Sequence, residues 1–410
     1  MEDVTAVSTL RLRGSWGFTG NKDALNRYEY QSTFNTGGDY NFGGEIVTAA
    51  AIDQLANANL EWERSQSINV GVDLGFLDDA VTLTTEYFQN TNEEILLNVP
   101  LPNSFGYSGD TRANTASVVS DGFEVEAGYE SRSTGDFFWS VNLNFSHSTN
   151  EVESLGLGNP INAQSWGWGG STASKRLEEG EPIFYWYGWE VDRLFQEDDF
   201  DENGDLVDGL PEHRATTAPG DIKFKDLNGD GEVNAEDQTN LGDPHPDYTF
   251  GIQGDASWGA FDASLFLQGV AGFQVAPAYQ GFSRGMTRVW NHETAVLDRW
   301  TPQNTDTDVP RAVDGDPNNN SRFSDRFVQD GDYLRLKRVT IGYTPDFING
   351  LSQVRSARIY IRGEDLLTLT GYDGLDPEVV NSSGDLLGFG YDDNPLPRPR
   401  RFQVGVQLGF

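Results

Sequence analysis

The stretch FFWSVNLNFS at residues 137–146 places large apolar and small polar side chains at alternating positions. Successive side chains of a β-strand point to opposite faces, so this stretch predicts a strand with one apolar and one polar face. Ten further segments repeat the pattern, which predicts eleven such strands in total. They lie at residues 10–18, 68–76, 81–87, 123–129, 185–191, 250–258, 261–267, 333–343, 357–361 and 402–410.

The length of these segments separates two architectures. A strand that crosses a bilayer at a tilt needs about 9–11 residues, whereas strands of soluble sheets average about 5–6. Several segments reach the longer value, and their polar faces carry charged residues such as Asp73, Glu124 and Glu126. A dry core would not hold these charges unpaired, whereas a water-filled lumen would. The pattern therefore favours a transmembrane β-barrel, and a large soluble sandwich or β-helix is the alternative.

The connections between the segments are of two kinds. Short turns lie at residues 77–80, 131–136 and 259–260. Short turns on one side and long loops on the other are typical of outer-membrane barrels. We therefore interpret residues 1–410 as one all-β, antiparallel unit with extracellular-type loops. These long polar connections cover about residues 20–61, 156–182, 196–247, 276–329 and 371–400.

The composition excludes several other classes of protein. The 410 residues hold 64 Asp and Glu against 28 Lys and Arg, a net charge of -36 that would repel nucleic acid. The absence of Cys excludes disulfides and thiolate metal sites. The longest strongly apolar stretch, residues 46–52, is much shorter than the roughly 20 residues of a membrane-spanning helix. We also expect no enzyme, because no GxSxG, HExxH, P-loop or dinucleotide motif occurs.

The excess of carboxylates has two explanations. Dense carboxylates hold water and tolerate high ionic strength, where their mutual repulsion is screened, so this acidic composition is typical of a salt-adapted source. Alternatively, the acidic loops gather divalent cations.

Several stretches resemble the SusC/RagA family of TonB-linked outer-membrane transporters. The likeness follows the chain in order over nearly its whole length, so chance is a poor explanation. The stretches are LRLRGSWGFTGN (10–21), NANLEWERSQSINVGVDLGFL (57–77), TTEYFQNTNEEILLNVPLP (84–102), GDIKFKDLNGDGEVNAEDQTNLGDPHPDYTFG (220–251), FLQGVAGF (266–273), DRWTPQN (298–304), DYLRLKRVTIGYT (332–344), GYDGLDPEV (371–379) and PRRFQVGVQLGF (399–410).

This resemblance implies that the chain is the C-terminal half of a transmembrane barrel of about 22 strands. Such transporters also carry a signal peptide and a plug domain. Neither is expected in these 410 residues, whose first twelve lack a basic region followed by an apolar run. The resemblance further implies an outer-membrane location, a SusD-like surface lipoprotein as partner, and contacts with TonB through the plug, with the barrel assembly machinery and with outer-membrane lipid.

Residues 226–237, DLNGDGEVNAED, match a twelve-residue calcium-binding loop. Oxygen donors at positions 1, 3 and 5 converge on the ion, a Gly at position 6 permits the sharp turn, and position 12 holds Asp in place of the usual Glu. We predict a calcium ion here and no other cofactor, with an Asx-rich turn as the alternative. A weaker copy begins at Asp199. The predicted ligands are Asp226, Asn228, Asp230, Glu232 and Asp237.

Two further features concern aromatic residues. The apolar alternation of the last segment continues without a slip to Phe410, and the resemblance implies that this terminal aromatic is the assembly signal of the barrel. Aromatic runs at residues 165–170 and 185–189 fit packing within loops or at the membrane interface better than binding of sugars.

Three hypotheses about function remain. The first is a TonB-dependent importer of oligosaccharides or peptides. The second is a secreted, soluble β-rich protein that binds glycans or mediates adhesion through a dockerin-like calcium loop. The third is a passive channel, which would conduct without TonB.

Overall fold

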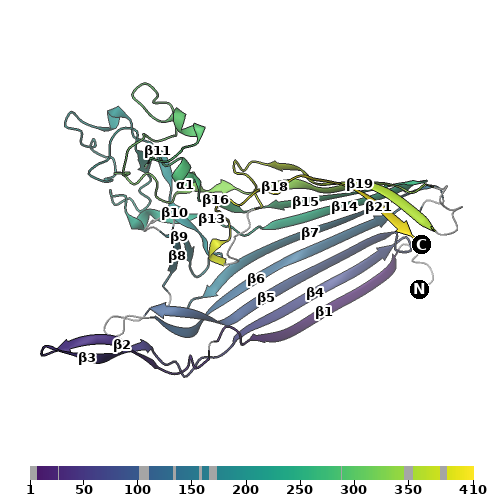
Figure 1. The fold of residues 1–410 in the computed structure, drawn as a ribbon, viewed down its shortest axis with the longest axis horizontal. Coiled ribbons are helices and arrows are strands. Elements are labelled where there is room, and N and C mark those ends of the chain that lie inside the picture. Colours follow the sequence, from purple (N-terminus) through teal and green to yellow (C-terminus); the bar gives the residue numbers. More distant parts are fainter. Residues whose placement is uncertain are drawn as a thin grey trace.

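The computed structural model describes residues 7–25, 27–100, 110–132, 135–156, 159–165, 173–287, 289–345, 354–378 and 386–410. One curved antiparallel sheet dominates it, and its strands run side by side in Figure 1. Each strand pairs with its neighbour in the sheet, and β1 and β21 are the two edges. In spatial order the strands are β1 (Val7–Asn21), β4 (Glu63–Phe76), β5 (Val81–Pro100), β6 (Asp110–Glu130), β7 (Phe137–Ser154), β14 (Tyr248–Trp258), β15 (Phe261–Ala271), β18 (Tyr333–Tyr343), β19 (Ser356–Thr370) and β21 (Arg401–Gly409).

Ten of the eleven predicted segments are strands of this sheet. The eleventh, at residues 185–191, was wrongly assigned. Its first five residues form β10 (Tyr185–Trp189), a short strand of a separate four-stranded sheet, and all five are buried. Its sequence YWYGW contains aromatic rings and a glycine but no charged residue, so it lacks the wet face of the other segments. The sheet therefore has ten strands.

The two faces of the sheet differ as the alternation predicts. Apolar side chains on one face are exposed and are not covered by a second layer, which contradicts a soluble sandwich. Aromatic residues gather toward both ends of this face, as in the interfacial belts of membrane barrels. One belt holds Tyr129, Phe137, Trp139, Trp258, Phe261 and Tyr343, and the other holds Tyr87, Phe123, Phe145 and Tyr248.

The strand pairing explains two local features of the sequence. Trp258 pairs with Phe261, so β14 and β15 are joined by a two-residue turn in which Gly259 adopts a positive φ of 55°. β18 also contains a bulge. Against β15, Leu336 pairs with Leu267 and Arg338 pairs with Phe266, so Lys337 is the extra residue.

The long connections fold into compact structure at one end of the sheet (Figure 1). We name the described parts of segments 155–247, 272–332 and 371–400 the loop cap. Its strands are β8 (Ile161–Ser165), β9 (Ala173–Leu177), β10, β11 (Val191–Leu194), β12 (Ile222–Phe224), β13 (Gln238–Gly242), β16 (Gln274–Pro277), β17 (Gln329–Asp330) and β20 (Tyr391–Asp392). Its helical turns are α1 (Gln280–Ser283), η2 (Glu197–Asp199), η3 (Ala235–Asp237), η4 (Thr294–Asp298), η5 (Asp325–Phe327) and η7 (Leu386–Gly388).

Most of the buried apolar core lies in the loop cap. Trp186, Phe323 and Tyr391 form one cluster, and Phe224 and Trp300 belong to a second. The sheet contributes its own side chains mainly where it meets the cap. The loop cap is thus packed around its own apolar clusters at one end of the sheet.

The connection between β1 and β4 behaves differently. It forms the hairpin of β2 (Thr33–Phe42) and β3 (Glu45–Gln54), which extends away from the cap in Figure 1. Helices are short throughout the described ranges, and none of them could span a bilayer.

Candidate functional site

The polar face of the sheet is divided by charge. Side chains on this face follow from the strand register, and carboxylates predominate from β4 to β15, whereas guanidinium groups predominate from β18 to β21. Such a division creates an electric field across the face. The acidic half holds Asp73, Glu86, Glu124, Glu126, Asp255 and Asp262, and the basic half holds Arg335, Arg338, Arg358, Arg362 and Arg401.

A cation on the edge strand β1 borders the acidic half. Arg13 on β1 donates to Glu86 at 2.8 Å and lies 3.1 Å from Asp73. Glu86 and Glu124 are direct cross-strand partners, an arrangement of like charges that costs stability. A cavity of about 460 Å³ opens over these residues and Glu126. A cavity filled with water would hydrate the carboxylates, which lowers the cost of grouping like charges on this face.

The bulge in β18 anchors a segment of the loop cap to the basic half. Arg335 is almost fully buried and binds Asp376 and Glu378. Lys337, the bulged residue, lies 3.1 Å from Glu378 and 3.6 Å from Asp365 on β19. Lys337 and Arg335 thus share the carboxylate of Glu378, and two cations hold one acidic segment.

This acidic segment, residues 371–378, also reaches the other side of the loop cap. Asp373 accepts hydrogen bonds from Gln280 and Arg284, which belong to α1 and the residue after it, at 2.9 Å each. The hydroxyl of Tyr372 donates to Asp392 at 2.5 Å, and burial together with this bond raises the pKa of Tyr372. Segment 371–378 therefore links β18 of the sheet to other parts of the loop cap.

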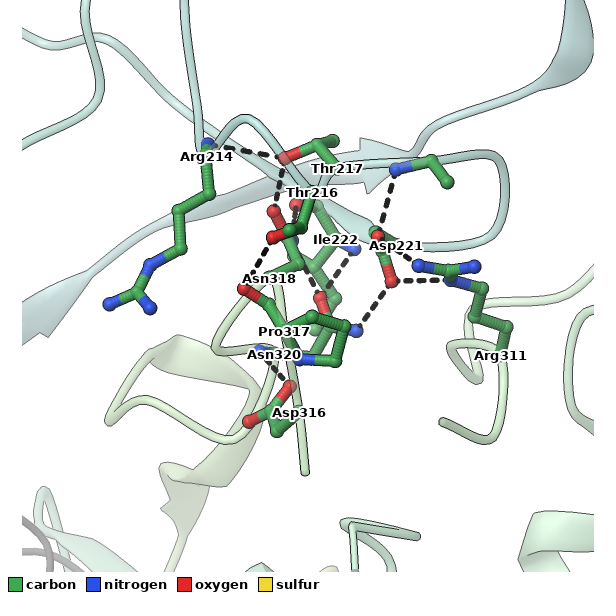
Figure 2. Close-up of polar contacts among 11 residues, drawn as sticks. Arg214, Thr216, Thr217, Asp221, Ile222, Arg311, Asp316, Pro317, Asn318 and Asn320 are labelled. Carbon is green, nitrogen blue, oxygen red and sulfur yellow. Dashed lines mark hydrogen bonds and ion pairs between the residues drawn. The ribbon is translucent and has the colours of Figure 1, made fainter. Parts of the chain in front are cut away.

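A buried polar cluster joins two of the long connections (Figure 2). The fully buried carboxylate of Asp221 accepts from Nε and Nη2 of Arg311 at 2.8 and 2.9 Å. It also accepts from the backbone N–H of Ala218 and the amide of Asn320, each at 2.9 Å. The amide of Asn318, also buried, donates to the carbonyl of Ile222 at 3.1 Å. Residues 214–222 and 311–320 are thus fixed together although they are about 100 positions apart in sequence.

A second anchor in the loop cap uses a stacked cation. The guanidinium of Arg322 lies 5.2 Å from the ring centre of Trp189 and 4.3 Å from that of Phe224. It donates to the carbonyls of Asn318 and Asn319, and burial lowers the pKa of Arg322 to about 10. Aromatic faces and carbonyls thus take the place of a carboxylate partner.

The predicted calcium loop closes on itself through its acidic side chains. Asp226 accepts from the backbone N–H groups of Gly229 and Gly231 at 2.7 and 2.9 Å. Asp237 is fully buried and accepts from the backbone N–H groups of Leu227 and Asn234 at 2.8 Å. Within the described ranges, no group of three or more His, Asp or Glu side chains is arranged to hold a metal ion. The calcium site stays a prediction, since an Asx-rich turn explains the same contacts.

Calcium titration would test this loop. If the ion binds, Asp226→Ala should abolish calcium binding measured by calorimetry and should remove any calcium-dependent rise in thermal stability. Asp201→Ala, in the weaker copy, is the matched control and should leave the titration unchanged. Identical thermograms for the unaltered protein with calcium and with a chelator would contradict the prediction.

The other predicted residues lie apart from these clusters. Phe410 follows β21 and is 77% exposed, and its role in assembly stays a prediction. The aromatic run of β10 is packed in the core of the loop cap, as expected, whereas most of the run at 165–170 lies outside the described residues. Sequence reasoning missed the Asp221–Arg311 pair, because nothing in the spacing links two residues 90 positions apart.

Known proteins show the same architecture. Residues 6–287 match the family described as "TonB dependent receptor-like, beta-barrel". TonB-dependent receptor P3 of Formosa agariphila is 31% identical over 100% of this chain and 40% of its own length. TonB-dependent receptor SusC of Bacteroides thetaiotaomicron is 24% identical over 100% of this chain and 38% of its own length.

Two solved structures share the fold. The RagAB peptide importer in its "open-open" state superposes with a TM-score of 0.78 at 21% identity, over 100% of this chain and 41% of that chain. The RagAB peptide transporter gives a TM-score of 0.76 at 21% identity, over 100% and 42%. The chain spans about two fifths of the length of the curated relatives it matches. The family match covers more than half of the sequence and confirms the SusC/RagA resemblance, so the chain belongs to the TonB-dependent receptor β-barrels of the outer membrane.

Proposed function

We propose that this chain forms part of the wall and the external loops of an outer-membrane importer for oligosaccharides or peptides. The observation that carries the proposal is the sheet itself, which exposes apolar side chains on one face and charged side chains on the other. Lipid solvates the first face and a water-filled lumen the second. The loop cap at one end of the strands would meet the cargo first.

Import then needs no covalent chemistry from this chain. A hydrated solute loses little solvation in a polar lumen, so passage depends on gating and on transient contacts with the wall. The resemblance to the SusC/RagA family supports TonB as the energy source, acting through a plug domain. It also supports a SusD-like surface lipoprotein as a lid over the loop cap.

Gene deletion in the source organism would test the proposal. Loss of the gene should abolish uptake of fluorescently labelled oligosaccharides or of labelled peptides, and the intact gene should restore it. Deletion of TonB in the complemented strain separates importer from passive channel, because only the importer would lose uptake. Unchanged uptake of both labelled pools in the deletion strain would contradict the proposal.

A further inference from the structure

A cavity in the loop cap is lined by two arginines and by apolar side chains. Its volume is about 300 Å³, at the lower end of the range of about 300–1,000 Å³ typical of small-molecule pockets. Its lining includes Arg284, Arg326, Val296, Val309, Phe327 and Asp308. The lining thus combines cationic, acidic and apolar side chains.

The two arginines differ in their partners. Arg284 binds the carboxylates of Glu293 and Asp373, at 2.8 and 2.9 Å. Arg326 donates from Nη1 to the backbone carbonyl of Asp308 at 2.5 Å, and in the described part of the chain no carboxylate lies within 4.0 Å of it. A guanidinium has five N–H donors, so most of those of Arg326 are available to a ligand in the cavity.

The charges around Arg326 affect how readily its guanidinium stays protonated. Burial lowers the pKa of Arg326, and nearby Arg284 acts in the same direction, whereas Asp308 opposes them. A partly buried cation without an ion-pair partner is costly, and an anionic ligand would remove that cost.

A second observation favours an anionic cargo independently of the cavity. On the basic half of the polar face, Arg362 and Arg401 share one carboxylate, that of Glu364, at 4.0 and 3.9 Å. Arg338 donates a hydrogen bond to the amide oxygen of Gln253 at 3.5 Å, and its cross-strand partner on β19 is the same Glu364. On the last three strands of the sheet, Arg side chains thus outnumber Asp and Glu side chains, although Asp and Glu outnumber Lys and Arg in the whole chain.

We propose that the imported cargo is an oligosaccharide with carboxylate-bearing sugar units, and that the cavity around Arg326 captures one such unit. This inference rests on the proposed function and specifies its cargo. The carboxylate would bind Arg326, and the C–H face of the ring would pack on Val309 and Phe327. The basic half of the polar face would then guide the anion along β18–β21, away from the acidic half.

The cavity favours a sugar acid over an acidic peptide for a chemical reason. Asp308 lines the cavity together with Arg326, and a carboxylate offers only hydrogen-bond acceptors to a ligand. One sugar-acid unit offers both a carboxylate for the arginine and hydroxyl donors for Asp308, whereas an ionised Glu or Asp side chain offers only acceptors.

Binding of matched probes to the full-length transporter in detergent would test the inference. The probes are an oligogalacturonate, its fully methyl-esterified and therefore neutral form, and a Glu-rich peptide of similar length. The oligogalacturonate should bind most tightly. Arg326→Gln should weaken this binding roughly ten- to one-hundred-fold, the effect of losing a charge-assisted hydrogen bond. The same variant should leave the weak binding of the ester unchanged.

Two further variants make the result specific. Arg326→Lys should recover part of the affinity, because it restores the charge. Arg214→Gln, which removes an exposed guanidinium that points away from the cluster in Figure 2, should bind like the unaltered protein. Equal affinity for acid and ester, no binding of either, or tighter binding of the peptide would overturn the inference. Normal uptake of neutral sugars or peptides in cells would then show that the import function itself stands.

Discussion

Asp221→Ala is expected to loosen the loop cap while the barrel sheet stays folded. The carboxylate is fully buried and holds Arg311 through two hydrogen bonds. Removing one partner of a buried ion pair costs about 3–5 kcal/mol. We expect the lower end of this range, because the guanidinium of Arg311 keeps 25% exposure and can turn to water. Hydrogen exchange of the full-length protein should show lost protection at residues 214–222 and 311–320.

A matched control separates this effect from loss of any ion pair. Asp192 pairs with Lys223 at 2.8 Å in the same region, but its side chain is 41% exposed. Exposed pairs contribute about 0–1 kcal/mol, so Asp192→Asn should leave the exchange pattern of the loop cap nearly unchanged. Equal protection in the Asp221 and Asp192 variants would show that the polar cluster does not hold the two segments together.

Leu265→Arg is expected to impair the stability of the barrel in lipid. Leu265 lies midway along β15, pairs with Val339 and is exposed on the apolar face. A cation on the lipid-facing side of a barrel costs about 2–4 kcal/mol near the bilayer centre. The variant should unfold at a lower urea concentration in liposomes, and less of it should reach the heat-modifiable folded form in cells.

The neighbouring residue provides the control. Ser264 faces the opposite side and is the cross-strand partner of Asp255. Ser264→Arg adds the same charge beside a carboxylate in the water-filled lumen, so its urea midpoint should stay close to that of the unaltered protein. A larger loss for Ser264→Arg than for Leu265→Arg would mean that the two faces are assigned the wrong way round.

The sheet was predictable because a strand with one apolar and one polar face shows in the sequence as apolar and polar residues at alternating positions. Residues 139–146 and 402–410 alternate without interruption, and the phase change around Leu336 marks the bulge. The segment at 185–191 was assigned wrongly, because an aromatic strand in a packed core and an apolar strand facing lipid have similar sequences when no charged residue lies within them.

The loop cap was not predictable in the same way. Its strands have two to five residues, too few to establish a period. Its decisive contacts, such as Asp221 with Arg311 and Arg335 with Asp376, join residues far apart along the chain. The division of charge across the polar face was not predictable either, because each strand contributes few charged side chains and their grouping depends on strand order.

The concentration of close packing in the loop cap has an evolutionary consequence. On the sheet, many residues of suitable polarity satisfy a lipid or water environment equally well, so substitutions should accumulate freely there. In the cap, Trp186 and Phe323 are fully buried, so a change in the volume of either side chain would disturb the packing of its neighbours. Amino-acid substitutions should therefore be rarest in segments such as 220–251 and 371–378 and more frequent in the strands of the sheet.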